Sequence, residues 1–275
     1  MFAIINYFEE QMEIIETNIE AAKLGLDADV LHDLRVGIKR LKALYQVLDP
    51  ISEGRFDSKT NFADVHILFK EVGKLRDVQV QKSLFSFFAQ ENADYTYTEF
   101  EELLNAREET ASDELKLILQ QFDNGIIGVS LEAANAFLDD ITKEEATNLT
   151  KKLLKKRFKQ IAELLPNKKD EELMHELRSR IKQACYILEI LALMQPEKEF
   201  TKHPKRLKLS AELLGQWHDH IVLIAALTDF LVDKTDVEDF DADPYTDLLS
   251  IVRADAKKLL KEGRKLLKAH PLKLS

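Results

Sequence analysis

The strongest constraint on the fold of this chain is an internal repeat. Residues 30–39, VLHDLRVGIK, match residues 173–182, LMHELRSRIK, at five positions with an offset of 143. A second block, GKLRD at 73–77, matches GQWHD at 215–219 with an offset of 142. Because both blocks occur in the same order in each half, the sequence predicts a pseudo-symmetric fold produced by duplication.

The pattern of apolar residues predicts that the repeated unit is helical. Apolar side chains recur at helical spacing through most of the chain, and the alternation typical of strands is absent. Only 8 glycines and 6 prolines interrupt the 275 residues, which excludes a turn-rich β-sandwich or barrel and argues against a glycine-rich nucleotide loop. We expect an all-α protein with antiparallel bundles. The expected helices span roughly 2–23, 28–49, 59–90, 95–121, 142–165, 169–194, 203–232 and 243–269.

The repeat also predicts the organisation of the chain. We expect a first four-helix repeat at 1–125, a connector at 126–141 and a second four-helix repeat at 142–275, packed together as a single domain over 1–275. In the connector, Gly128 argues for a non-helical segment.

Local signals mark several helix ends. Thr142 and Glu145 have the spacing of a capping box, in which each side chain bonds the backbone amide of the other. Pro50 and Pro196 predict helix ends just before them, because the proline ring disfavours helical backbone in the preceding residue. The acidic stretch 233–243 lacks an EF-hand pattern and is expected to be a solvated loop.

Charge and cysteine content limit the expected partners and location. The net charge is −10, with 14 Lys and Arg against 29 Asp and Glu in residues 1–150, and 25 against 20 in residues 151–275. An acidic protein repels phosphate backbones at long range, so a nucleic-acid partner is not expected. No apolar run is long enough for a membrane span, and no membrane partner is expected. The single cysteine, Cys185, is typical of a reducing cytoplasm.

The second expected helix carries basic side chains in a line. The apolar residues expected to form its core face are Leu31, Leu34, Ile38, Leu41, Tyr45 and Leu48. Residues His32, Arg35, Lys39 and Lys42 are spaced i, i+3, i+7 and i+10. They therefore follow one neighbouring face. Cations in a row repel one another, so this line predicts an anion between them. The second repeat offers His175, Arg178 and Lys182, with Cys185 in place of the last cation.

These motifs resemble the signatures of the CHAD family, the conserved histidine α-helical domain, over nearly the whole chain. The matching residues are His32, Arg35, Val36, Lys39, Arg40, Leu41 and Lys42 in the first signature, His175, Arg178, Lys182 and Tyr186 in the second, and Arg76, Asp77, Gly215 and Asp219 in the helices that follow. Gln183 and Cys185 stand where the second signature is usually basic. The resemblance implies two four-helix bundles around a central basic channel.

The same resemblance implies a function. It implies non-catalytic binding of inorganic polyphosphate, with no cofactor, in the cytoplasm or at polyphosphate granules. The residues expected to bind polyphosphate are His32, Arg35, Lys39, Arg40, Lys42, Arg76, Lys151, Lys152, Lys155, Lys156, His175, Arg178 and Lys182. Asp77 and Asp219 are expected to be structural and to hold a cation, with Arg35 or His32 as the partner of Asp77. Protonation of His32 and His175 near neutral pH would strengthen binding.

Two basic clusters have alternative interpretations. The lysines of 151–159 extend the polyanion track or form a solvated helix face, and the run 202–208 caps the channel or lies on the plain surface.

Other functions stay open at this point. The chain could be a helical protein-interaction scaffold with little polyphosphate affinity, or a metal-dependent enzyme that processes polyphosphate or triphosphate. The sequence WHDH at 217–220 suggests a metal-dependent phosphohydrolase. However, adjacent residues of a helix point about 100° apart, so His218 and Asp219 do not converge on one cation, and no metal site is expected. The basic lines could also simply neutralise internal carboxylates.

Overall fold

The computed structural model describes residues 2–92, 94–166, 171–196 and 198–268, with side chains from residue 205 onward in the last segment. The described residues form α-helices joined by short loops and contain no β-strand, which confirms the all-α prediction. The helices are α1 (Phe2–Leu24), α2 (Ala28–Ile51), α3 (Ser58–Glu91), α4 (Thr98–Gln121), α5 (Gly125–Leu138), α6 (Lys143–Leu164), α7 (Glu171–Met194), α8 (Lys198–Asp233) and α9 (Asp243–Lys268).

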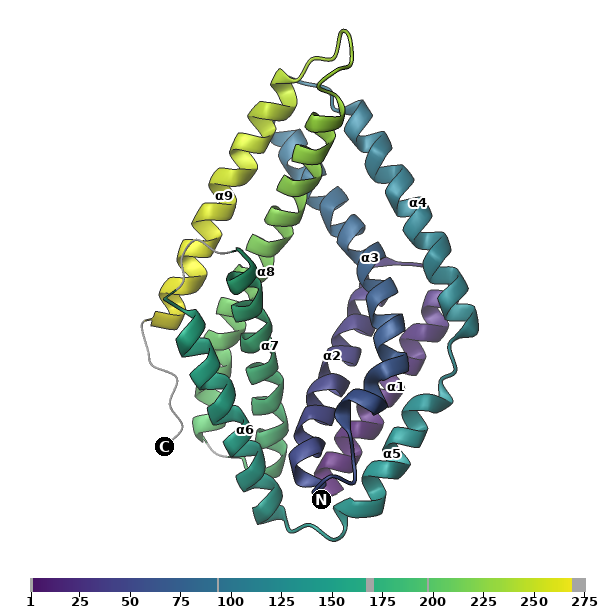
Figure 1. The fold of residues 1–275 in the computed structure, drawn as a ribbon, viewed down its shortest axis with the longest axis vertical. Helices are drawn as coiled ribbons and strands as arrows, with labels where there is room; N and C mark the ends of the chain where they lie inside the picture. The colour runs from purple at the N-terminus through teal and green to yellow at the C-terminus, as the bar shows by residue number, and fades with distance from the viewer. Residues whose placement is uncertain (1, 93, 167–170, 197, 269–275) are drawn as a thin grey trace.

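The helices form two halves that meet at both ends of an elongated molecule (Figure 1). In one half α1, α2 and α3 lie together, and in the other α6, α7 and α8 do so. The long helices α3 and α8 continue to the upper end, where α4 and α9 return beside them. The halves contact each other where α2 packs against α6 and α7, and where α3 packs against α8. No helix in the described part of the chain has the length and apolarity needed to cross a membrane.

The helix boundaries follow the sequence signals closely, with three differences. One is that α8 begins at Lys198, five residues before the expected start at 203. The capping box of Thr142 and Glu145 is present, and α7 ends at Met194, just before Pro196. Helix α2 runs one residue past Pro50, since the proline stands in the last turn. The connector is itself helical, because α5 buries Ile127, Phe137 and other apolar residues against the core. Its glycines therefore do not interrupt the helix.

A continuous apolar core holds the two halves together at the lower end. The predicted apolar residues of α2, Leu31, Leu34, Ile38, Leu41, Tyr45 and Leu48, are all fully buried. They belong to the same core as Leu177, Ile181 and Leu188 of α7. Since each apolar face is buried within its own bundle and the halves meet at α2 and α7, the neighbouring polar faces of these helices come together.

A separate aromatic cluster closes the upper end. Phe85 of α3 and Phe100 of α4 have ring centroids 5.0 Å apart, and Phe100 lies 5.2 Å from Phe230 of α8. Phe230 in turn lies 5.0 Å from Tyr245 of α9. The cluster joins the tips of both halves, so the molecule is clamped at two ends with polar surfaces between them.

This arrangement predicts that the aromatic cluster contributes strongly to stability. Phe100→Ala removes a fully buried ring and should lower the free energy of unfolding by about 3–5 kcal/mol, measured by chemical denaturation. Phe87, a neighbouring residue of α3 with 54% of its surface exposed, provides the control. Phe87→Ala should change stability by less than about 1 kcal/mol. Equal losses in both variants would contradict the assigned role of the cluster.

Candidate functional site

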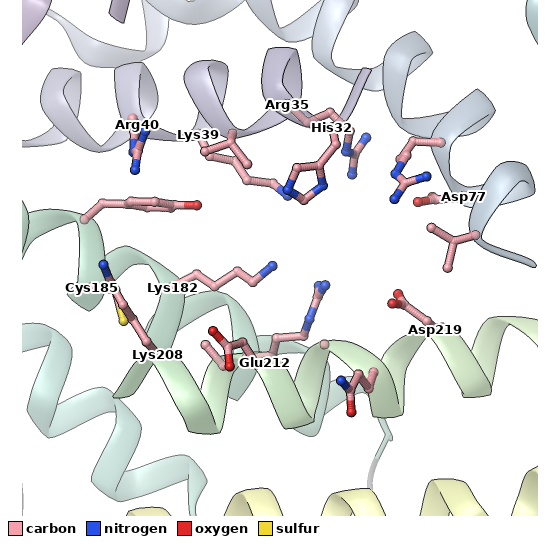
Figure 2. Close-up of a pocket in the computed structure, with 18 of the residues that line it drawn as sticks. His32, Arg35, Lys39, Arg40, Asp77, Lys182, Cys185, Lys208, Glu212 and Asp219 are labelled. Atoms are coloured by element: carbon pink, nitrogen blue, oxygen red, sulfur yellow. The ribbon is translucent and has the colours of Figure 1, made fainter. Parts of the chain in front are cut away.

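A cavity of about 450 Å³ lies between the two halves, lined by α2, α3, α7 and α8. Side chains of α2 point across it toward side chains of α7 and α8 (Figure 2). We refer to it as the first cavity. Its basic lining residues are His32, Arg35, Lys39, Arg40, Arg76, Arg178, Lys182 and Lys208.

A second cavity, of about 300 Å³, adjoins the first. The two cavities share seven lining residues, namely Arg35, Lys39, Asp77, Arg178, Lys182, Tyr186 and Asp219. The second cavity adds Lys42, Gln46, Phe69, His175, Gln183 and His218, among others. The two cavities therefore open on either side of one central group of four cations and two carboxylates.

The central arginine of α2 is positioned by α3. The guanidinium of Arg35 lies over the ring of Phe69, 4.8 Å from its centroid, and its Nη1 donates a long hydrogen bond of 3.5 Å to the Phe69 carbonyl. The same nitrogen passes so close to Gly73 that a Cβ atom there would lie 2.2 Å from it. A side chain at position 73 would therefore have to displace the guanidinium from its present place.

The equivalent glycine of the second repeat leaves more room. A Cβ on Gly215 would meet Arg178 at 3.8 Å, which is an ordinary van der Waals contact. The two arginines therefore approach their glycines differently, although the sequence blocks around Gly73 and Gly215 are repeated.

Burial and mutual repulsion weaken the charges of the central lysines. Burial, followed by the positive charges of Lys182, Arg35 and Arg178, lowers the pKa of Lys39 to about 7. Burial and Arg178 lower the pKa of Lys182 to about 8. Because these shifts disfavour the protonated amines, the empty site is electrostatically strained, and an anion placed among the cations would relieve this strain.

The pKa values of the histidines are also lowered. This corrects the expectation from the sequence that His32 and His175 are protonated near neutral pH. Burial and the charge of Arg76 lower the pKa of His32, and burial and Arg178 lower that of His175. His218, whose ring centroid lies 4.6 Å from that of His175, has its pKa lowered to about 3 by the same causes. The pKa values of His32 and His175 therefore lie below their ordinary range, because burial and then neighbouring cations oppose protonation.

Two carboxylates partly balance the central cations. Desolvation raises the pKa of Asp77, and the charges of Arg35 and Lys39 oppose the shift. Desolvation also raises the pKa of Asp219, against the charges of Arg178 and Lys182. The suggested partnership of Asp77 with Arg35 is thus an electrostatic one, and each carboxylate acts chiefly on the arginine of one half.

At the outer end of the first cavity, a carboxylate joins cations from both halves. Glu189 of α7 lies 3.5 Å from Nε of Arg40 on α2 and 3.0 Å from Nζ of Lys208 on α8. Arg40 is expected at the site from its sequence motif, whereas Glu189 is not, because nothing in the spacing of α7 shows which helix its carboxylate will face. Lys208 belongs to the run 202–208, and its position in the cavity favours the capping interpretation for this residue. Lys202 and His203 lie outside the residues with described side chains.

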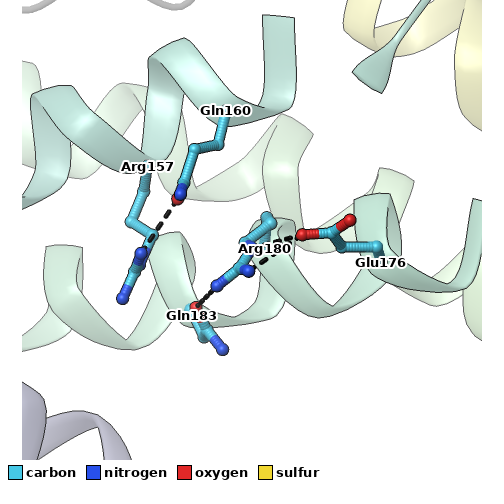
Figure 3. A network of polar contacts seen from close by, with 5 residues as sticks. All are labelled: Arg157, Gln160, Glu176, Arg180 and Gln183. Atoms are coloured by element: carbon cyan, nitrogen blue, oxygen red, sulfur yellow. Dashed lines mark hydrogen bonds and ion pairs between the residues drawn. The ribbon is translucent and has the colours of Figure 1, made fainter. Parts of the chain in front are cut away.

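The two departures from the basic signature lie in different cavities. Gln183 lines the second cavity, where its side-chain oxygen accepts a hydrogen bond of 3.4 Å from Arg180 (Figure 3). Arg180 also bonds Glu176 at 2.8 Å. Cys185 lines the first cavity, and burial together with Glu189 raises the pKa of its thiol to about 12. The thiol is therefore not activated as a nucleophile.

The lysines of α6 lie apart from the two cavities. Lys152, Lys155 and Lys156 are exposed, and none of them lines either cavity. Lys151 lines a different surface depression, beside Lys143 and Pro196. The structure thus brings together the basic residues of α2, α3 and α7, but it does not bring the α6 cluster into the same space.

The residues of the WHDH sequence diverge. His218 lines the second cavity and Asp219 lines both, whereas His220 packs on Phe88 and its Nε2 lies 3.1 Å from Asp255 of α9. In the residues that the structure describes, no three His, Cys, Asp or Glu side chains gather as a metal site requires.

Comparisons with known proteins agree with this architecture. Residues 6–228 match the family model of the CHAD domain. The crystal structure of the CHAD domain from the plant Ricinus communis is similar, with 17% identity, 99% of this chain and 93% of that chain covered, and a TM-score of 0.69. PptA from Streptomyces chartreusis has 12% identity, 97% of both chains covered and a TM-score of 0.66. At these identities the solved structures show the fold alone. A comparison with curated proteins found no similar sequence.

The strain among the central cations predicts that removing one of them stabilises the protein. Lys39→Met should raise the free energy of unfolding at pH 7 by about 1–3 kcal/mol, because the variant no longer buries an ammonium among like charges. Burial and neighbouring cations hold the pKa of Lys39 in the folded protein at about 7, below its ordinary value of 10.5. The unfolded wild type therefore binds more protons between these values, and wild-type stability rises with pH across this range. The advantage of the variant should shrink toward pH 10.

The control for this prediction is Lys155→Met, which removes an exposed lysine of α6. Chemical denaturation at pH 7 and pH 9.5 should show little change for the control, within about 0.5 kcal/mol. A Lys39→Met variant less stable than wild type at pH 7 would show that the central cations are not strained.

Proposed function

The chain belongs to the CHAD family, and from this premise we propose that the two cavities form one channel that binds inorganic polyphosphate without catalysis. The observation that carries the proposal is the concentration of positive charge between the halves. Within the described residues, the two cavities together are lined by eight Lys and Arg side chains and four Asp and Glu side chains, in a chain with a net charge of −10.

The cations differ in the way they would hold phosphate. Arg35 and Arg178 offer planar guanidinium groups that can bond two phosphate oxygens at once. Lys39 and Lys182 act as movable point charges, and an anion beside them would raise their lowered pKa values. Binding near pH 7 to 8 should therefore be accompanied by proton uptake, chiefly by these two amines.

The geometry also favours a thin polyanion over nucleic acid. Polyphosphate carries negative charge on every unit and has neither sugar nor base, so it can enter a space lined from both sides by side chains. The acidic exterior repels a bulky nucleic acid at long range. The raised pKa of Cys185 gives no support for a thiolate nucleophile, in keeping with binding rather than turnover. A binding role of this kind fits the cytoplasm or the surface of a polyphosphate granule.

Titration calorimetry with size-fractionated polyphosphate tests this proposal. Wild type should bind tightly at low salt and lose about 10- to 1,000-fold in affinity between 50 and 200 mM salt, because binding releases counterions. The combined variant Arg35→Ala, Lys39→Ala and Arg178→Ala should lose roughly 100-fold or more, since it removes three central cations.

A matched variant separates the channel from general surface charge. Lys152→Ala, Lys155→Ala and Lys156→Ala removes the same number of positive charges from α6. If the channel is the site, this variant should keep most of the affinity, and comparable losses in both variants would indicate diffuse attraction instead. Failure of folded wild type to bind at low salt would contradict the proposal and favour a protein-interaction scaffold.

The contact between Arg35 and Gly73 yields a second prediction. Gly73→Ala should displace the guanidinium from the site that a Cβ would enter and weaken polyphosphate binding about tenfold, the effect of losing one well-placed charged contact. Gly215→Ala places a methyl group at ordinary contact distance from Arg178 and should leave the affinity unchanged. Circular dichroism should show equal helix content in both variants. Equal affinities would contradict the role given to Gly73.

A further inference from the structure

The two openings of the proposed channel differ in their charged residues, as a comparison of equivalent repeat positions shows. At the outer end of the first cavity, the carboxylate of Glu189 lies between Arg40 and Lys208. We call these three residues the Glu189 cluster. It joins α2, α7 and α8 across the boundary between the halves.

The corresponding opening of the second cavity has no such carboxylate. With the repeat offset of 143, Gln46 is the sequence equivalent of Glu189, and Gln183 is the sequence equivalent of Arg40. Both glutamines line the second cavity. Among the residues that the structure describes there, the acidic ones are the shared Asp77 and Asp219. The second opening therefore has two uncharged amides at the positions equivalent to Glu189 and Arg40, and its added cation, Lys42, lies without a carboxylate of this kind among the described lining residues.

We propose that Glu189 is an internal competitor of the polyanion. Its carboxylate occupies Arg40 and Lys208 while the channel is empty, and a phosphate group reaching these cations has to displace it. The first opening then binds phosphate more weakly than the second, so a polyphosphate chain is held with unequal strength at its two ends. This inference rests on the proposed function and names the residue that sets the affinity of one end of the channel.

The contacts of the Glu189 cluster suit displacement. The Arg40 contact is long, at 3.5 Å, and Nε of Arg40 is buried without a hydrogen-bond partner in the described protein. The contact is therefore too long for a good hydrogen bond, and little direct bonding has to be broken when the carboxylate moves away. The side chain of Lys208 is 51% exposed and can turn toward a ligand. A like charge facing a bound phosphate opposes binding.

The experiment compares Glu189→Gln with a variant that removes a neighbouring carboxylate. Glu212 lines the same cavity, and within the described residues it makes no ion pair with Arg40 or Lys208. Glu212→Gln therefore removes the same amount of negative charge without freeing these cations. The affinity for size-fractionated polyphosphate and its dependence on salt are measured by titration calorimetry for wild type and both variants.

Glu189→Gln should bind about tenfold more tightly than wild type, the size of effect expected from one relieved charge contact. The slope of log affinity against log salt should become steeper by about 1 to 2, because each freed cation that contacts the phosphate adds about 0.7 to 0.9 to it through counterion release. Glu212→Gln should show a smaller gain and no comparable change in slope.

Other results overturn the inference in distinguishable ways. Unchanged or weaker binding by Glu189→Gln, with wild type binding normally, would show that Glu189 positions Arg40 and Lys208 for the ligand. Equal gains and slopes in both variants would show that only total negative charge matters. If wild type and both variants fail to bind at low salt, the proposed function fails and the inference fails with it.

Discussion

The central physical constraint on this structure is that like charges are held together between two helical halves. Arg35 and Lys39 of α2 face Arg178 and Lys182 of α7 around a shared space, where burial, together with repulsion from the other cations, lowers the pKa of both lysines. Such a group would separate on its own. It persists because the apolar faces of the same helices are buried in a continuous core below it and an aromatic cluster joins the helix tips above it. The scaffold therefore fixes the spacing of the cations before any anion arrives.

Several neighbouring groups reduce the repulsion between the central cations but do not remove it. Asp77 and Asp219 each place a negative charge beside the cations, and the ring of Phe69 lies below the guanidinium of Arg35. Gly73 allows that guanidinium to reach a backbone carbonyl of α3. The remaining positive charge is what an incoming polyanion would neutralise. Stability and the proposed anion binding would thus make opposite demands on these residues, a conflict that is common at functional sites.

The repeat gives the protein two similar openings with different chemistry. The histidines His32 and His175 occupy equivalent repeat positions and line different cavities. Elsewhere the equivalence is broken, because Glu189 corresponds to Gln46 and Cys185 to Lys42. Since the two halves supply residues to both cavities, each such difference changes one opening and leaves the other as it was. In the proposed channel, such differences between equivalent positions would make the two ends unequal.

The sequence by itself determined the helical class, most helix boundaries and the apolar face of α2, because these follow from periodicity and capping within a few neighbouring residues. The repeat and its motifs also identified the cations of α2 and α7 that share the site. Only the tertiary structure decided which distant charges meet. It places Lys208 and Glu189 beside Arg40, leaves the α6 lysines outside the cavities and makes a helix of the connector. The tertiary structure also decided the lowered pKa values of the histidines and lysines, because burial and repulsion arise when halves about 140 residues apart in the sequence pack together.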